Sequence, residues 1–221
     1  MEIFLNTCAF CNKRILASNN LFCIECNGLL PRTYFNLSED NIVLDKLKPF
    51  INLKAAGSFL YYNKNEMVQQ ILWEMKYNNN QELAREMGRL AYSNHENMFS
   101  NSIDCFIPIP LHASKLQLRG YNQTERFAEG LSEVSNLPMY KDVLTRNKKT
   151  ISQTKLDRNE RFQNLDAAFN VVNVEKIKGK HLVLLDDVVT TGATLISAGQ
   201  SLLEAGCASL SIYTLATAFE V

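Results

Sequence analysis

The 221-residue chain has no long hydrophobic run, no net charge and no leader-like start, and each absence excludes a class of protein. Apolar runs such as Leu182–Leu185 fall far short of the ~20 residues that a membrane-spanning helix needs, so we expect no membrane insertion. Because 23 basic residues balance 23 acidic ones, the chain as a whole lacks the excess of positive charge that is typical of nucleic-acid-binding proteins. Residues 1–6 show no basic region followed by an apolar stretch, which excludes a secretory signal and predicts a cytoplasmic location.

The sequence also lacks internal repeats and low-complexity segments. With 46% hydrophobic and 21% charged residues, its composition is typical of a soluble globular protein with a core. The length suits one domain with a small appendage, or two small domains.

Four of the six cysteines lie within the first 26 residues, and their spacing predicts a zinc site. Two Cys-x2-Cys pairs, eleven residues apart, can place four thiolates around one ion: Cys8, Cys11, Cys23 and Cys26. A segment this short, with few apolar residues, cannot fold by packing alone. A pair of disulfides is the alternative, which a reducing cytoplasm disfavours. Because the protein supplies all four ligands, we predict a structural Zn2+ in a module of residues 1–30.

Strand-like and helix-like segments alternate along the rest of the chain. Apolar runs predict strands at residues 55–62, 103–109, 169–174, 182–185 and 209–217. Helical spacing predicts helices around residues 67–75, 83–91, 127–134 and 193–205. The alternation predicts an α/β fold, with a mostly parallel sheet flanked by helices. We expect this domain to span residues 55–221, with residues 31–54 as a connector.

Residues 182–194 combine an apolar strand, two acids, a small-residue loop and a helix start. In an open parallel sheet, ligands bind beyond the carboxyl ends of the strands. The loop 190–194 can aim N–H groups and hydroxyls at a phosphate, and Gly192 lets the backbone approach it closely. Asp186 and Asp187 can accept hydrogen bonds from sugar hydroxyls or hold Mg2+ shared with the ligand. The run therefore predicts a ribose 5-phosphate site, the alternative being an ordinary strand end with a solvated acid pair.

This run resembles, at every position, the signature with which type I phosphoribosyltransferases bind 5-phosphoribosyl-1-pyrophosphate (PRPP). The four cysteines, residues 107–123 and Gln153-Thr-Lys-Leu with Arg161 and Asn164 resemble the ComF (ComFC) family, which pairs a zinc finger with this domain. The resemblance implies that Asp186 and Asp187 contact the ribose, and that the 5-phosphate is held by Thr190, Thr191, Gly192, Ala193 and Thr194. It also implies Mg2+ bound with PRPP, and a link to single-stranded DNA uptake in natural transformation.

The turn after residues 103–109 is predicted to face the same sheet edge. In phosphoribosyltransferases the corresponding turn holds pyrophosphate, so the resemblance makes Leu111, His112 and Lys115 candidate PRPP ligands. His112 can equally be a structural hydrogen-bonding residue. The polar residues that begin the next helix either hold a nucleobase-like acceptor or cap the helix: Arg119, Tyr121, Asn122 and Gln123.

Residues 148–161 resemble the mobile loop that closes over PRPP in this superfamily. A basic lid excludes water and neutralises charge on the departing pyrophosphate, which makes Lys155 and Arg161 the candidate catalytic residues, beside Thr150 and Gln153. A surface loop without such a role is the alternative.

Between residues 141 and 161, seven basic and three acidic residues leave an excess of four positive charges. This excess is typical of a solvated loop or of a polyanion site, and single-stranded DNA is a candidate partner that would compete with PRPP for Lys148, Lys149 and Arg158. Two functions stay open: an enzyme that transfers phosphoribosyl to an unidentified acceptor with release of pyrophosphate, and a PRPP-sensing scaffold whose zinc module contacts nucleic acid or proteins of the DNA-uptake machinery.

Overall fold

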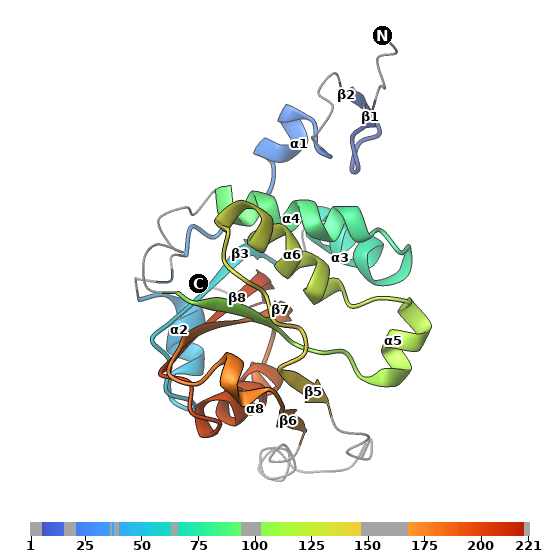
Figure 1. Cartoon of the computed structure of the whole chain (residues 1–221). Helices are drawn as coiled ribbons and strands as arrows, with labels where there is room; N and C mark the ends of the chain where they lie inside the picture. The colour runs from blue at the N-terminus through green and yellow to red at the C-terminus, as the bar shows by residue number, and fades with distance from the viewer. Residues whose placement is uncertain are drawn as a thin grey trace, which may run out of the picture.

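Figure 1 shows the order of the elements in the computed structural model of the chain. The described residues are 6–15, 21–35, 37, 40–62, 66–93, 103–146 and 168–218. Near the N-terminus, β1 (Asn6–Thr7) pairs antiparallel with β2 (Arg14–Ile15), and the short helix α1 (Ile24–Gly28) follows. These three elements form a small cysteine-bearing segment at one end of the molecule (Figure 1).

A four-stranded parallel sheet, in the order β3-β8-β7-β4, forms the centre of the rest of the described chain. Its strands are β3 (Ala55–Tyr61), β4 (Cys105–Pro108), β7 (His181–Val189) and β8 (Ser209–Thr217). The strands are covered on both faces, so they appear in the sequence as continuous apolar runs. The mostly parallel sheet and these four strands are confirmed.

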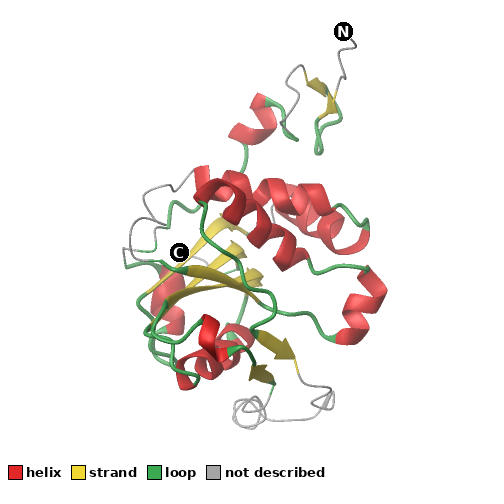
Figure 2. Ribbon diagram, in the orientation of Figure 1, coloured by secondary structure: helices red, strands yellow, loops and turns green. Residues whose placement is uncertain are grey.

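Helices cover both faces of the sheet (Figure 2). On one face lie α3 (Glu66–Tyr77), α4 (Gln81–Ser93) and α6 (Gln123–Ser135), and on the other α2 (Ile42–Leu47) and α8 (Ala193–Glu204). Because successive strand residues point to opposite faces, Phe106 belongs to the first core and Ile107 to the second. The four predicted helices are thus confirmed. No helix in the described ranges is long and apolar enough to cross a membrane.

The predicted strand at residues 169–174 is shorter and lies outside the central sheet. Its β6 (Phe169–Val171) pairs antiparallel with β5 (Leu144–Arg146), a strand that the sequence pattern does not reveal. Asn173 has a left-handed φ of 50°, and the 3-10 turn η2 (Val174–Lys176) follows it. Asn tolerates this conformation better than other non-glycine residues, which explains why the chain turns here.

The predicted connector, residues 31–54, carries secondary structure where it is described. Asn41 caps α2 by accepting hydrogen bonds from the N–H groups of Val43 and Leu44, and it donates to the Ala56 carbonyl at 2.8 Å. Leu47, at the end of α2, is fully buried in the core beneath α8. The domain boundary at residue 55 stays a prediction.

Helices α4 and α6 are in backbone contact along their crossing. A Cβ added to Gly130 on α6 would lie 1.9 Å from the carbonyl oxygen of Arg85 on α4, so only glycine allows this approach. Ion pairs flank the contact, with Arg85 Nη2 3.0 Å from Glu129 and Arg89 Nε 2.8 Å from Glu133. The two helices therefore form a rigid support behind the first turn of α6, which reaches the site described next.

Candidate functional site

The turn after β7 forms a small hollow at the carboxyl edge of the sheet. Its volume is about 40 Å³, and it is lined by Asp186 and by the residues from Val188 to Leu195. Gly192 precedes α8 with a φ of 79°, and no side chain in the described part of the chain caps the helix start. Ala193 N–H makes only a long contact of 3.4 Å, to Thr191 Oγ1. A helix start of this kind favours an anion, and hydroxyl-bearing residues surround it.

The helix α2 supports this hollow from below. A Cβ added to Gly192 would lie 2.3 Å from Leu47 Cδ2, and the left-handed φ already disfavours any other residue. The loop therefore packs directly against Leu47, because residue 192 has no side chain. Sequence reasoning missed Leu47, because nothing in its local pattern refers to a loop 145 residues later.

Asp187, at the end of β7, is held by two side chains from the helical layer. Its Oδ2 lies 2.8 Å from Lys76 Nζ on α3 and accepts a hydrogen bond of 2.9 Å from Gln123 Nε2 on α6. Its Oδ1 accepts from Val188 N–H at 2.7 Å. Both oxygens thus have donors, which fix the direction of the carboxylate. Lys76 was not among the predicted site residues, since a single lysine on an amphipathic helix normally points to solvent.

Asp186 has a different environment from its neighbour. Loss of hydration, followed by repulsion from the Asp187 carboxylate, raises the pKa of Asp186 to about 8. Its Oδ1 accepts a hydrogen bond of 2.8 Å from Asp187 N–H, which opposes this shift. A ligand that supplies hydrogen-bond donors or positive charge would therefore favour the ionised form of Asp186.

The turn after β4 leaves the sheet next to the acid pair, because Ile109 N–H donates to Leu185 O at 2.9 Å. His112 caps the following helix α5 (Ala113–Arg119), since its Nδ1 accepts from Ser114 N–H at 3.3 Å. The same Nδ1 lies 2.7 Å from Ser114 Oγ, and the buried Nε2 has no partner among the described residues. Lys115 is exposed on α5, and Leu111 is half-buried in the turn.

The polar residues at the start of α6 are buried and divide between two roles. Asn122 caps the helix by accepting from Thr124 N–H at 3.0 Å, and its Nδ2 donates to Ile109 O at 2.9 Å. Gln123 instead bridges the site, because its Nε2 donates to Asp187 while its Oε1 accepts from Arg119 at 2.9 Å. Capping thus describes Asn122, whereas Gln123 faces the acid pair. Tyr121, the remaining member of this group, donates its hydroxyl to the Met75 carbonyl.

A second, larger cavity of about 440 Å³ adjoins the small hollow, and Val188 and Thr190 line both. Its other walls are the end of β3 and one face of α3: Tyr62, Gln69, Leu72, Trp73, Lys76 and Tyr77. Lys76 connects this cavity to the acid pair through its contact with Asp187. No sequence motif marks this wall, although its α3 members recur at helical spacing.

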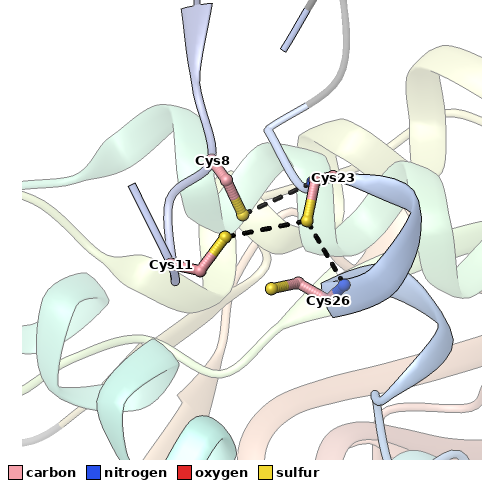
Figure 3. A group of neighbouring side chains, drawn as sticks. All are labelled: Cys8, Cys11, Cys23 and Cys26. Atoms are coloured by element: carbon pink, nitrogen blue, oxygen red, sulfur yellow. Dashed lines mark hydrogen bonds between the residues drawn. The ribbon is translucent and has the colours of Figure 1, made fainter. Parts of the chain in front are cut away.

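The four N-terminal cysteines converge on one point, as predicted (Figure 3). Their sulfur atoms all lie within 4.8 Å of one another, and the sulfurs of Cys11 and Cys23 are 3.7 Å apart. All six cysteines of the chain are free thiols. Burial opposes ionisation of Cys8, but hydrogen bonds from Cys11 and Cys23 N–H outweigh it and lower its pKa to about 6. Four close sulfurs can hold a metal such as zinc.

The proposed lid lies outside the described residues. These include the predicted catalytic residues Lys155 and Arg161, and with them Lys148, Lys149, Thr150, Gln153 and Arg158. Of the predicted basic patch, Lys141 and Arg146 are described, and the Arg146 guanidinium lies 5.3 Å from the centre of the Phe169 ring.

The chain is similar to a known protein family and to several known proteins. The phosphoribosyl transferase domain family matches residues 75–219, which include both acids, the loop after β7 and the turn after β4. Competence protein F of Haemophilus influenzae is 29% identical over 161 residues, 69% of each chain. DNA utilization protein YhgH of Escherichia coli K12 is 26% identical over 94% of this chain and 88% of that protein. Competence protein ComFC of Bacillus subtilis is 31% identical over 70% of this chain and 61% of that protein.

Proposed function

We propose, since the chain belongs to the phosphoribosyl transferase domain family and to its ComF/ComFC group, that it binds PRPP at the hollow after β7. The observation that carries the proposal is the combination in one place of an uncapped helix start, a hydroxyl-rich loop and an acid pair. A phosphate next to a vicinal diol is the ligand that suits all three.

In this proposal the 5-phosphate contacts the loop Thr190–Thr194, with Gly192 and Ala193 N–H at the start of α8. The ribose hydroxyls donate to Asp186 and Asp187. The pyrophosphate lies against the turn after β4, where Leu111 offers its backbone, His112 its buried Nε2 and Lys115 its charge. Lys155 and Arg161 are proposed to stabilise the leaving pyrophosphate.

Mg2+ bound with PRPP fits the donor set, because carboxylate oxygens next to phosphates are the ligands that this ion prefers. It would supply positive charge to the leaving pyrophosphate. The residues of this chain position the two substrates: Lys76 and Gln123 orient Asp187, and α2 holds the phosphate loop. Transfer of the phosphoribosyl group then depends on positioning and charge stabilisation more than on a protein nucleophile.

The cysteine segment is proposed to hold a structural Zn2+ and to have no part in the transfer. The names of the relatives, competence proteins and a DNA utilization protein, support a role in handling incoming single-stranded DNA and contact with DNA-uptake proteins. A labelled oligonucleotide, titrated at low and moderate salt, tests this partner. Absence of binding at low salt would contradict it. The second candidate, a PRPP sensor without transfer, predicts PRPP binding but no pyrophosphate release with any acceptor.

PRPP binding is tested by calorimetry with Mg2+, using Asp187→Ala as the site variant. Loss of a charged acceptor of hydrogen bonds is expected to weaken binding by about 1.5–3 kcal/mol. Asp187→Asn keeps the shape of the side chain and serves as a second variant. Asp142→Ala is the matched control, because Asp142 is an exposed acid that pairs with Lys176 away from the hollow. Equal PRPP affinity in wild type and both Asp187 variants would refute the assigned role.

A further inference from the structure

Arg32 joins the cysteine segment to the central sheet. Its guanidinium donates two hydrogen bonds of 2.7 Å to Asn27, one from Nη1 to the backbone oxygen and one from Nη2 to Oδ1. Asn27 lies in α1, directly after Cys26, one of the four clustered cysteines. The same guanidinium lies 5.9 Å from the centre of the Phe59 ring on β3. One side chain thus contacts both the segment and the domain, which Figure 1 shows joined by a short stretch of chain.

Residues 31–33 extend the sheet beyond its edge strand β3. They pair antiparallel with residues 59–61 through two backbone hydrogen bonds and a bridge at Arg32. In one of these bonds, Tyr61 N–H donates to the Pro31 carbonyl at 2.9 Å. Because β8 pairs with the other side of β3, this short segment covers the edge that β3 would otherwise expose.

The edge pairing ends beside the larger cavity. Tyr62, the residue after Tyr61, lines that cavity. Its own N–H donates to the Thr217 carbonyl on β8 at 2.7 Å. While residues 31–33 are paired, this end of β3 is held from both sides, and without them it is held by β8 alone. Loss of the pairing should therefore loosen the cavity wall at Tyr62.

The Arg32 guanidinium depends on Asn27 for its position. Burial lowers the pKa of Arg32, because loss of hydration disfavours the charged form. Its Nε is buried and has no hydrogen-bond partner in the described part of the chain. Without the two acceptors of Asn27, a partly buried charge would keep only the Phe59 ring beside it, which is costly. Movement of Arg32 into solvent would then be favoured, and residues 31–33 would leave β3 with it.

The acceptors of Asn27 are in place only while α1 is folded. This helix has five residues, far fewer than the ~12 at which an isolated helix becomes even marginally stable. Cysteines fix its first turn, since Cys23 Sγ accepts a hydrogen bond from Cys26 N–H at 3.4 Å. Loss of a metal ion from the four sulfurs would therefore unfold α1 and remove the partners of Arg32.

We propose that Arg32 is a conformational switch, which couples the metal state of the four cysteines to the wall of the larger cavity. The proposal rests on the proposed zinc site and is independent of PRPP. With the metal bound, Arg32 holds residues 31–33 on β3 and the wall at Tyr62 is fixed. With the metal lost, Arg32 moves into solvent and the wall loosens. The cysteine segment thus regulates the domain without taking part in its chemistry.

Hydrogen exchange and tryptophan quenching test the switch on the full-length protein, after its zinc content has been measured. Chelation is expected to raise exchange of the two amides that join residues 31–33 to β3, those of Thr33 and Tyr61, about tenfold, while β7 and β8 stay slow. Trp73, the only tryptophan of the chain, lines the same cavity as Tyr62, so its quenching by acrylamide should increase. Added zinc should reverse both changes.

Variants test whether Arg32 carries the coupling. Arg32→Met keeps an apolar stem without donors, so in the zinc-loaded protein it should raise exchange at Tyr61 by the same factor with zinc content unchanged. Chelation should then add little, because both changes break one link. Asn27→Ala removes only the Oδ1 acceptor, should give a smaller increase, and tests the same link if Arg32→Met does not fold. Arg14→Met is the matched control, since Arg14 is an exposed arginine of the cysteine segment, and it should leave exchange in β3 unchanged.

The outcomes separate the switch from the proposed function. If chelation releases zinc while exchange of Tyr61 or quenching of Trp73 stays unchanged, the switch is wrong and the zinc site stands. If Arg32→Met responds to chelation as the wild type does, another contact carries the coupling and the role of Arg32 is refuted. If the purified protein holds no metal, the zinc proposal fails and the switch fails with it, whereas PRPP binding is unaffected.

Discussion

The cysteine segment and the α/β domain are stabilised by different means. In the segment, the four sulfurs within 4.8 Å of one another are the central feature, and few apolar side chains are buried around them, among them Ile15 and Phe22. In the domain, many buried side chains in two apolar cores, on opposite faces of the sheet, each contribute to stability. We therefore expect a single substitution to unfold the segment completely, whereas a single substitution in the domain should lower its stability by a graded amount.

The largest effect should follow removal of the metal from the cysteine segment. The purified protein is expected to contain one zinc per chain, and chelation or Cys23→Ser should unfold the segment, because structural zinc contributes about 10 kcal/mol or more to such folds. Hydrogen exchange should rise in residues 21–30, while exchange in β7 and β8 stays slow.

The control is Cys207→Ser, which changes a buried cysteine outside the cluster and should leave the zinc content unchanged. Metal analysis without zinc, with the cysteines free or disulfide-bonded, would contradict the prediction. Cooperative loss of both regions on chelation would show instead that they form one folding unit.

A smaller effect is expected where the domain has least room for change. Gly130→Ala places a methyl group 1.9 Å from the Arg85 carbonyl, so α4 and α6 must separate. We expect a loss of about 3 kcal/mol in the free energy of unfolding, at the upper end of typical overpacking, measured by urea denaturation with zinc content unchanged. Gly28→Ala in the cysteine segment is the control, because a Cβ there meets nothing within 4 Å. Equal stability of the two variants would refute the close contact.

The sequence predicts most of this architecture because the decisive patterns are local. The apolar strand before Asp186, the glycine before α8 and the paired cysteines each combine residues within about twenty positions of one another. Their chemistry can therefore be inferred without knowing the fold. The helices could be predicted for the same reason, since their apolar spacing is uninterrupted.

The rest of the site depends on contacts between distant segments. Leu47 supports Gly192, and Lys76 contacts Asp187, over separations that no local pattern encodes. The wall formed by Trp73 and Tyr62 was missed for a related reason. An exposed aromatic residue indicates a binding site only when it is known to border a cavity, and the sequence does not show the cavity. The antiparallel pairing of β6 was missed because three residues carry too little periodicity to show their partner.

The smallest effect should appear at the site itself, because Asp186 is only half-buried and solvent screens much of its charge. The pKa of Asp186 is raised from 3.8 to about 8 in the folded protein, so between these pH values the folded state binds more protons than the unfolded state. Stability from this carboxyl is therefore complete below pH 4 and is lost as the pH rises to 8. Asp186→Asn, which does not titrate, should raise the thermal midpoint of the ligand-free protein at pH 8.5 by ~2–4 °C, and leave it unchanged near pH 4. Asp142→Asn is the control with the opposite sign, because hydrogen bonding from Lys176 lowers the pKa of Asp142. If Asp186→Asn stabilises the protein equally at both pH values, the difference in stability between wild type and variant comes from packing and not from the charge of the acid pair.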